Sequence, residues 1–119
     1  TFPKQKPEKY YGNREYKRNL LNYNISNIQK KASQMLFRIM EGKGKALYLI
    51  GIDDNGSIIG LNRKELDLSI ELIKLISLEI NSKIKKIYIY KGGKGHICSV
   101  HISLPKNKLQ HLEDVFLIN

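Results

Sequence analysis

The stretch Ala46-Leu47-Tyr48-Leu49-Ile50-Gly51-Ile52, continued by Asp53-Asp54-Asn55-Gly56 and Ser57-Ile58-Ile59-Gly60, decides the fold of this chain. Its first seven residues are almost all apolar, which is typical of a strand buried on both faces of a sheet. The Asn-Gly pair favours the positive φ angles of a tight turn, so residues 57–60 are predicted to return as an antiparallel strand. We therefore expect a β-hairpin whose first strand is fully buried.

Helices are predicted on both sides of this hairpin. Ser26 with Gln29, and Asn62 with Glu65, have the spacing of a capping box, in which side chains at the start of a helix bond the free backbone amides. Apolar residues follow each pair at helical intervals, so both helices are expected to pack on the core. The predicted helices run from Ser26 to near residue 41 and over residues 63–80.

Three more strands complete the predicted sheet. Residues 15–20 alternate enough to form a short edge strand. Residues 84–90 and 97–104 are joined by the loop Lys91-Gly92-Gly93-Lys94-Gly95, and the second of these strands alternates apolar and polar side chains. The order β-α-β-β-α-β-β predicts an α+β domain in which two helices pack on one face of a single mixed five-stranded sheet.

Composition limits the class of protein. The chain has 119 residues, which suits one domain with a modest core. It has no apolar run of the roughly 18 residues that a membrane span needs, and no signal-peptide pattern. Its single cysteine, Cys98, excludes an internal disulfide and fits a reducing compartment. We expect a cytoplasmic protein with no membrane partner, in which residues 1–13 are a basic lead-in or linker and residues 14–105 are the domain.

Positive charge dominates the sequence. The 21 Lys and Arg residues exceed the 11 Asp and Glu residues and give a net charge of +10. Such an excess favours a polyanionic partner such as RNA or the ribosome, because neutralising phosphates releases counterions. The chain is also rich in Ile and Asn, and AT-biased coding produces the same lysine content whatever the function. Charge alone leaves both explanations open.

One predicted strand and its loop concentrate this charge without an acidic residue. The candidate nucleic-acid site there consists of Lys83, Lys85, Lys86, Tyr88, Tyr90, Lys91 and Lys94. Lysines contact phosphates and tyrosines stack on unpaired bases. The alternative is a solvated sheet edge that lysines protect against aggregation. Cations between Lys4 and Arg18 extend the same basic surface or form a flexible tail.

No complete catalytic or metal-binding pattern is present. The segments Gly42-Lys43-Gly44-Lys45 and Gly92-Gly93-Lys94-Gly95 lack the spacing of a phosphate loop, so plain turns are expected. His96, Cys98 and His101 have zinc-ligand chemistry, but on a strand His101 faces away from the other two. We therefore expect no nucleotide, cofactor or metal site in this chain.

Three carboxylates offer an alternative interpretation. Glu15, Asp53 and Asp54 would suit the Mg²⁺ or Mn²⁺ site of a nuclease if the fold brought them together. The simpler interpretation makes Glu15 an edge-strand residue and the two aspartates turn residues. We expect the simpler arrangement.

Four blocks of sequence occur in order, namely Gly12-Asn13-Arg14-Glu15-Tyr16-Lys17, Gln34-Met35-Leu36-Phe37-Arg38-Ile39-Met40-Glu41-Gly42-Lys43-Gly44, Tyr48-Leu49-Ile50-Gly51-Ile52-Asp53-Asp54-Asn55-Gly56 and Gly60-Leu61. Together they resemble the segment that precedes the GTPase domain in the GTP-binding protein 1 and 2 family of translational, elongation-factor-like GTPases. The residues taken to carry the family motif are Glu15, Tyr16, Lys17, Gln34, Met35, Arg38, Glu41, Gly42, Gly51, Asp53, Asp54, Gly56 and Gly60.

This resemblance implies an N-terminal domain without catalysis of its own, in a protein that binds GTP and Mg²⁺ elsewhere. It also implies work near the ribosome, with RNA or the ribosome and the protein's own GTPase domain as partners. Val115-Phe116-Leu117-Ile118-Asn119 looks like the first strand of such a GTPase domain. Residues 106–119 are therefore expected to be a linker and the start of a truncated GTPase domain.

The strand around Glu15 and the Asp-Asp-Asn-Gly hairpin are also similar to Schlafen-like nucleic-acid-binding domains, some of which cleave RNA with acidic residues. In that pattern a second glutamate precedes Glu15, whereas this chain has Tyr11 at the corresponding place. The departure argues against cleavage and leaves RNA binding open. We expect a non-catalytic accessory domain, and the alternatives are a metal-dependent endoribonuclease and a purely structural partner-binding domain.

Overall fold

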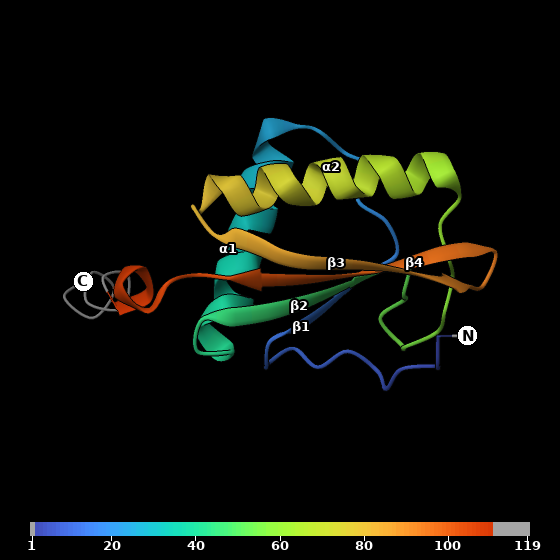
Figure 1. Ribbon diagram of the computed structural model, residues 1–119, viewed down its shortest axis with the longest axis horizontal. Coiled ribbons are helices and arrows are strands. Elements are labelled where there is room, and N and C mark those ends of the chain that lie inside the picture. The colour runs from blue at the N-terminus through green and yellow to red at the C-terminus, as the bar shows by residue number, and fades with distance from the viewer. Residues whose placement is uncertain (1, 111–119) are drawn as a thin grey trace.

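Four strands and two long helices make up most of the fold (Figure 1). The computed structural model describes residues 2–110. The strands are β1 (Arg14–Lys17), β2 (Lys45–Ile50), β3 (Lys83–Gly92) and β4 (Gly95–Ser103), and the helices are α1 (Ile25–Glu41) and α2 (Arg63–Glu79). The strands lie in the order β1-β2-β4-β3, with β1 parallel to β2 and the other pairs antiparallel. The fold is therefore α+β, built on one mixed sheet.

The prediction of five strands and two helices is wrong. Within residues 2–110 the sheet has four strands, and a third helix begins at residue 106. Residues 57–60 reverse direction but form only an isolated bridge between Ile52 and Ile58. The amides of Ile59 and Gly60 both donate to the carbonyl of Gly51, at 2.9 and 3.0 Å. Consecutive amides of a strand point in opposite directions, so this pair cannot belong to a ladder.

The turn that precedes this segment keeps one predicted property. Gly56 has a positive φ of +89°, and its amide donates to the carbonyl of Asp53 at 2.8 Å. Asn55 is not among the described residues with positive φ, so the turn is not the type in which both central residues take that conformation. The hairpin prediction is therefore correct about the reversal and about Gly56, and wrong about the strand that follows.

Local side-chain chemistry fixes where the helices begin. The capping box of α2 is confirmed, since the Asn62 side chain accepts from the Glu65 amide and the Glu65 carboxylate accepts from the Asn62 amide. The start of α1 is earlier than predicted. Its cap is Asn24, whose side chain accepts from the Asn27 amide, so a capping box at Ser26 does not form because that residue is already helical.

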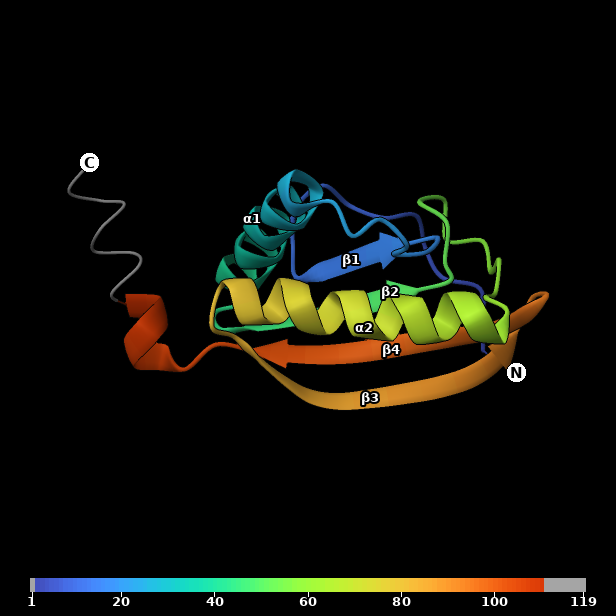
Figure 2. The same ribbon diagram turned by 90° about the horizontal axis from the view of Figure 1, so that it is seen from above.

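Both helices pack on the same face of the sheet, as predicted (Figure 2). The core between them contains Met35 and Ile39 of α1, Leu72, Ile73 and Ile76 of α2, and Tyr48, Ile50, Val100 and Ile102 of the central strands. Leu49 is buried on the opposite face, so β2 is covered on both sides, as its apolar run predicts. Over residues 2–110, none of the helices combines the length and apolarity that crossing a membrane requires.

The face opposite the helices is called here the open face, and residues 2–13 cross part of it as a strap without helix or strand (Figure 1). The strap amides of Gln5 and Glu8 donate to the carbonyls of Gly56 and Asp54, at 3.1 and 2.7 Å. The strap therefore packs on the domain. The predicted domain boundaries at residues 13 and 105 stay predictions, and the proposed GTPase strand at 115–119 lies outside the described residues.

Candidate nucleic-acid interface

The basic strand β3 forms one edge of the sheet, and its pairing with β4 divides the candidate residues into two groups. Paired residues of neighbouring strands point to the same face. By this register the open face carries Lys83, Lys86, Tyr88 and Tyr90. Lys91 lies on the helix side, Lys85 falls in an irregularity of the ladder, and Lys94 lies in the β3–β4 turn. The structure thus brings four of the seven candidates together and separates the other three.

The open-face tyrosines belong to a row of aromatic rings. The ring centroids of Tyr88 and Tyr90 are 6.4 Å apart, and Tyr90 lies 5.0 Å from Phe2 of the strap. On the other side, Tyr88 makes an edge contact with His101 of β4 at 5.7 Å. Tyr88 and Tyr90 remain about two-fifths exposed, at 42 % and 39 %. Sequence reasoning missed His101 and Phe2 as site residues, although the alternation of β4 already placed His101 on this face.

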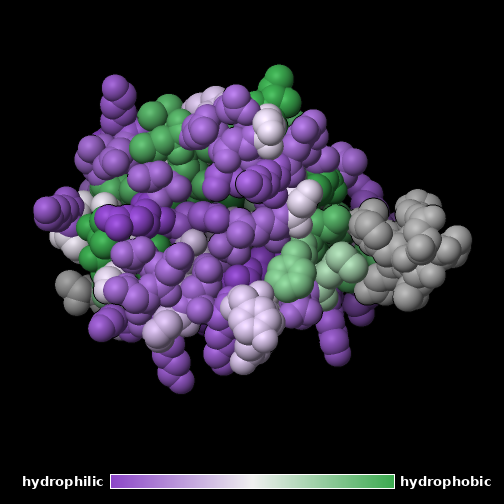
Figure 3. All heavy atoms as spheres, turned by 180° about the vertical axis from the view of Figure 1, so that it is seen from behind, coloured by the Kyte–Doolittle hydropathy of each residue, from purple (hydrophilic) through white to green (hydrophobic). Residues whose placement is uncertain are grey.

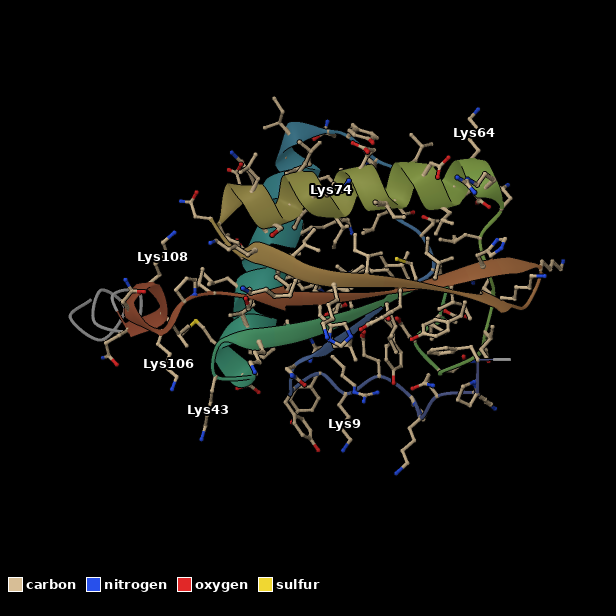
Figure 4. All side chains as sticks on the ribbon, viewed as in Figure 1. Lys9, Lys43, Lys64, Lys74, Lys106 and Lys108 are labelled. Atoms are coloured by element: carbon tan, nitrogen blue, oxygen red, sulfur yellow. The ribbon has the colours of Figure 1, made fainter. Side chains whose placement is uncertain are left out.

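Lysines project from both sides of the molecule but come from different elements on each (Figure 4). Lys64 of α2 points away from the sheet, whereas Lys9, Lys43 and Lys106 point to the opposite side. The view from behind, which shows the α1 and β1 side, is also mostly hydrophilic (Figure 3). The net charge is therefore spread over the surface, and position relative to the aromatic row is what distinguishes the open-face lysines.

The cations between Lys4 and Arg18 also fall into two groups, one lining a groove and one paired with carboxylates. Lys4, Lys6, Lys9 and Arg14 line an open groove of about 540 Å³ between the strap and β1. Lys17 instead bonds Glu15 at 3.2 Å, and Arg18 pairs with Asp53 at 3.4 Å. The basic surface extends along the strap but does not include these two side chains.

A buried ionic cluster joins the strap, β1 and α1 behind this surface. Arg38 of α1 is 3 % exposed, and its Nε donates to the carboxylate of Glu15, which is 2 % exposed, at 2.8 Å. Its remaining donors bond the strap carbonyls of Lys9, Tyr11 and Gly12 at 2.8–2.9 Å. One helical side chain therefore holds three backbone carbonyls of an otherwise irregular segment.

Other charged groups complete the cluster. Lys17 bridges Glu15 and the side-chain oxygen of Gln34, and Glu8 of the strap accepts from the Tyr16 amide. Burial raises the pKa of the Glu8 carboxyl, and the negative charges of Glu15 and Asp54 add to the rise. The cluster therefore holds its two carboxylates close to one arginine and one lysine.

The remaining family-motif residues also occupy structural positions. Glu41 accepts from the Gly12 amide at 3.0 Å, and a Cβ on Gly42 would lie 1.9 Å from the Lys45 carbonyl oxygen. A Cβ on Gly60 would lie 2.3 Å from the Gly92 carbonyl oxygen, where residues 59–61 meet the β3–β4 turn. The motif thus coincides with the joints that hold the strap, α1 and the two turns together.

The alternative metal sites do not assemble among residues 2–110, where no group of three His, Cys, Asp or Glu side chains has the arrangement to hold a metal ion. Glu15 is committed to Arg38 and Lys17, while Asp53 and Asp54 belong to the turn. Burial raises the pKa of the Cys98 thiol to about 11, which disfavours the thiolate that zinc binds.

Comparison with known proteins identifies relatives that match part of this chain. The chain is similar to part of GTP-binding protein 2. The mouse and human proteins of that name are each 35 % identical to it over 78 residues, which are 66 % of this chain and 13 % of theirs. An uncharacterized protein of Acanthamoeba polyphaga mimivirus is 34 % identical over 95 residues, 79 % of this chain and 51 % of the viral protein.

The chain spans about an eighth of the length of the GTP-binding protein 2 relatives and about half of the viral one. No family model matches the chain, and no solved structure matches it significantly. The expected resemblance is thus confirmed as a link to GTP-binding protein 2, whereas the resemblance to Schlafen-like domains stays a prediction.

Proposed function

We propose that this chain is a non-catalytic accessory domain of a GTP-binding, elongation-factor-like GTPase, and that it contacts RNA or the ribosome through β3. The similarity to GTP-binding protein 2 supports the first part. The observation that carries the second part is an acid-free strand of lysines beside exposed aromatic rings on the open face. GTP and Mg²⁺ belong to a separate GTPase domain, which is the other proposed partner, and the protein works in the cytoplasm.

The geometry favours binding over cleavage. A metal-dependent nuclease needs carboxylates that are free to bind the ion. Glu15 is 2 % exposed, and its carboxylate already accepts from Arg38 and Lys17. An endoribonuclease built on Glu15 would have to break the cluster that holds the strap.

Removing the positive charge of β3 and its turn tests the proposal. Substituting Lys85, Lys86, Lys91 and Lys94 with Gln should weaken binding to all RNA sequences about equally, because phosphate contacts carry no sequence information. It should also flatten the salt dependence, by about 0.7 in the logarithmic slope for each lysine that contacts a phosphate of a single strand. The fold should survive, since all four side chains are exposed. Fluorescence anisotropy titrations between 50 and 200 mM salt measure both quantities.

A matched control removes four charges from the helices instead, at Lys30, Arg63, Lys64 and Lys74, which are also exposed. This variant should bind RNA with nearly the affinity of the parent. Equal binding by both quadruple variants and the parent would reduce the basic strand to a solvated edge. A parent that binds no RNA at moderate salt would do the same, and the partner-binding domain would become the better proposal.

The chain itself should bind no GTP with meaningful affinity. Both glycine-lysine segments lie in turns, one between α1 and β2 and one between β3 and β4, and neither opens a helix that would receive phosphates. Calorimetric titration with GTP and Mg²⁺ checks this expectation. Micromolar binding would contradict the assignment of nucleotide binding to a separate domain.

A further inference from the structure

We infer that the part of the open face that the strap leaves uncovered, and not β3 alone, is a binding platform for single-stranded RNA, with His101 of β4 and Lys45 of β2 as part of it. This inference rests on the proposed function and deepens it. It names the unpaired form of the ligand, and it adds residues from two other strands to the site.

Sheet register places these residues in rows across three strands. In the first row Ser103 of β4 lies between Lys45 and Lys83, and in the next row His101 lies between Leu47 and Lys86. The third row places Ser99 beside Tyr88. Because paired residues share a face, the lysines gather at one end of the open face and the aromatic rings continue from them toward the strap.

The segments just before β2 and just after β4 add positive charge at this end of the open face. Lys43 lies just before β2 and Lys106 follows β4, and both point to the side away from α2 (Figure 4). The amide of Leu104 donates to the carbonyl of Gly44 at 2.9 Å, which holds the two segments together. The lysine end of the open face is therefore built from three separate parts of the chain, around residues 43–45, 83–86 and 106.

The aromatic row favours unpaired bases. His101 is exposed, Tyr88 is 42 % exposed, and the two rings are 5.7 Å apart. Stacking on an aromatic ring requires a base whose flat face is free, which a duplex hides inside its own stack. The helices lie on the other face of the sheet, so they do not obstruct such a strand. Lysines beside a stacking row match the phosphates that flank each base.

Two sets of substitutions separate the parts of this site. In the 119-residue chain, His101→Ala and Tyr88→Ala should each weaken binding of a fluorescein-labelled 12-nucleotide oligouridine about tenfold, without changing the salt slope, because they remove stacking and no charge. The triple variant K45Q/K83Q/K86Q should lower the slope by about 0.7 for each of the three lysines that binds a phosphate in the parent. A 12-base-pair RNA duplex should compete poorly with the single strand. Competition by the matching DNA strand measures how much the ribose contributes to the affinity.

Tyr23→Ala is the matched aromatic control. Tyr23 is also 42 % exposed, but its hydroxyl donates to the carbonyl of Leu68 on α2, in the helix layer. This variant should bind like the parent, and thermal unfolding should verify that all variants are folded. If the β3 quadruple variant loses RNA while His101→Ala, Tyr88→Ala and the triple variant bind normally, the platform is wrong and the proposed function stands. Equal affinity for the duplex also overturns the platform, and a parent that binds no RNA overturns both proposals.

Discussion

Replacing Arg38 with Met should lower the free energy of unfolding by about 3–5 kcal/mol, the range expected when one partner of a buried ion pair is removed. Arg38 is 3 % exposed, and its guanidinium bonds Glu15 together with three strap carbonyls. Without it, the buried Glu15 carboxylate keeps only Lys17 as a charged partner, and the carbonyls of residues 9, 11 and 12 lose their donors. Urea unfolding followed by circular dichroism measures the loss.

Arg63→Met provides the control for this prediction. Like Arg38, Arg63 pairs with a carboxylate, here that of Asp67 on the same helix. Its side chain is 84 % exposed, so the loss in free energy of unfolding should stay below about 0.5 kcal/mol. The double variant R38M/E15L should be less destabilised than the two single variants combined, since it removes both buried charges. Equal losses for Arg38→Met and Arg63→Met would mean that the ionic cluster does not hold the strap.

Replacing Gly56 with Val should have the second large effect. The φ of +89° strains a β-branched residue by about 1–3 kcal/mol. The structure adds a second cost, because a Cβ at this position would lie 2.0 Å from the carbonyl oxygen of Gln5 in the strap. The strap must move away or the turn must open, so the denaturation midpoint should fall and the strap should become more sensitive to proteolysis.

Gly12→Val separates strain from collision. Gly12 has a nearly identical φ of +86°, but no atom lies within 4 Å of a Cβ placed on it. This variant should therefore show the backbone strain alone and lose less stability than Gly56→Val. Identical midpoints for the two variants would contradict the packing of the strap against the turn.

Local patterns predicted those elements whose causes are local. The α2 helix has its capping box and its apolar stripe within one short stretch, so the sequence is enough to place it. The failed strand at residues 57–60 has a distant cause. The carbonyl of Ile59 accepts from the amide of Lys94, and Leu61 and His96 exchange two backbone hydrogen bonds, so this segment joins the β3–β4 turn. Backbone partners so far along the chain leave no periodic signal.

In the candidate site, too, the sequence predicted the features with local causes and missed those that depend on distant contacts. Charge and aromatic character selected all seven candidates but did not divide them between the two faces. Alternation accounts for Lys86, Tyr88 and Tyr90, whereas Lys83 shares their face only because the ladder is irregular between Ile84 and Lys86. Nothing local showed that Phe2 reaches Tyr90, since the strap has no regular structure. Arg38 was included among the family-motif residues, but its role was not predicted, because three of its partners are backbone carbonyls, which any residue type supplies.

The strap contacts also constrain the order of events during synthesis. Gln5 and Lys9 are made long before their partners, since Arg38 follows Lys9 by about thirty residues and Gly56 follows Gln5 by about fifty. At ordinary translation rates of about 5–20 residues per second, this basic segment waits for seconds without a docking site. The last of its backbone anchors to appear is the turn at Gly56, so the strap can dock only after β2 is complete. The ring contact between Phe2 and Tyr90 forms later still, once β3 has been made.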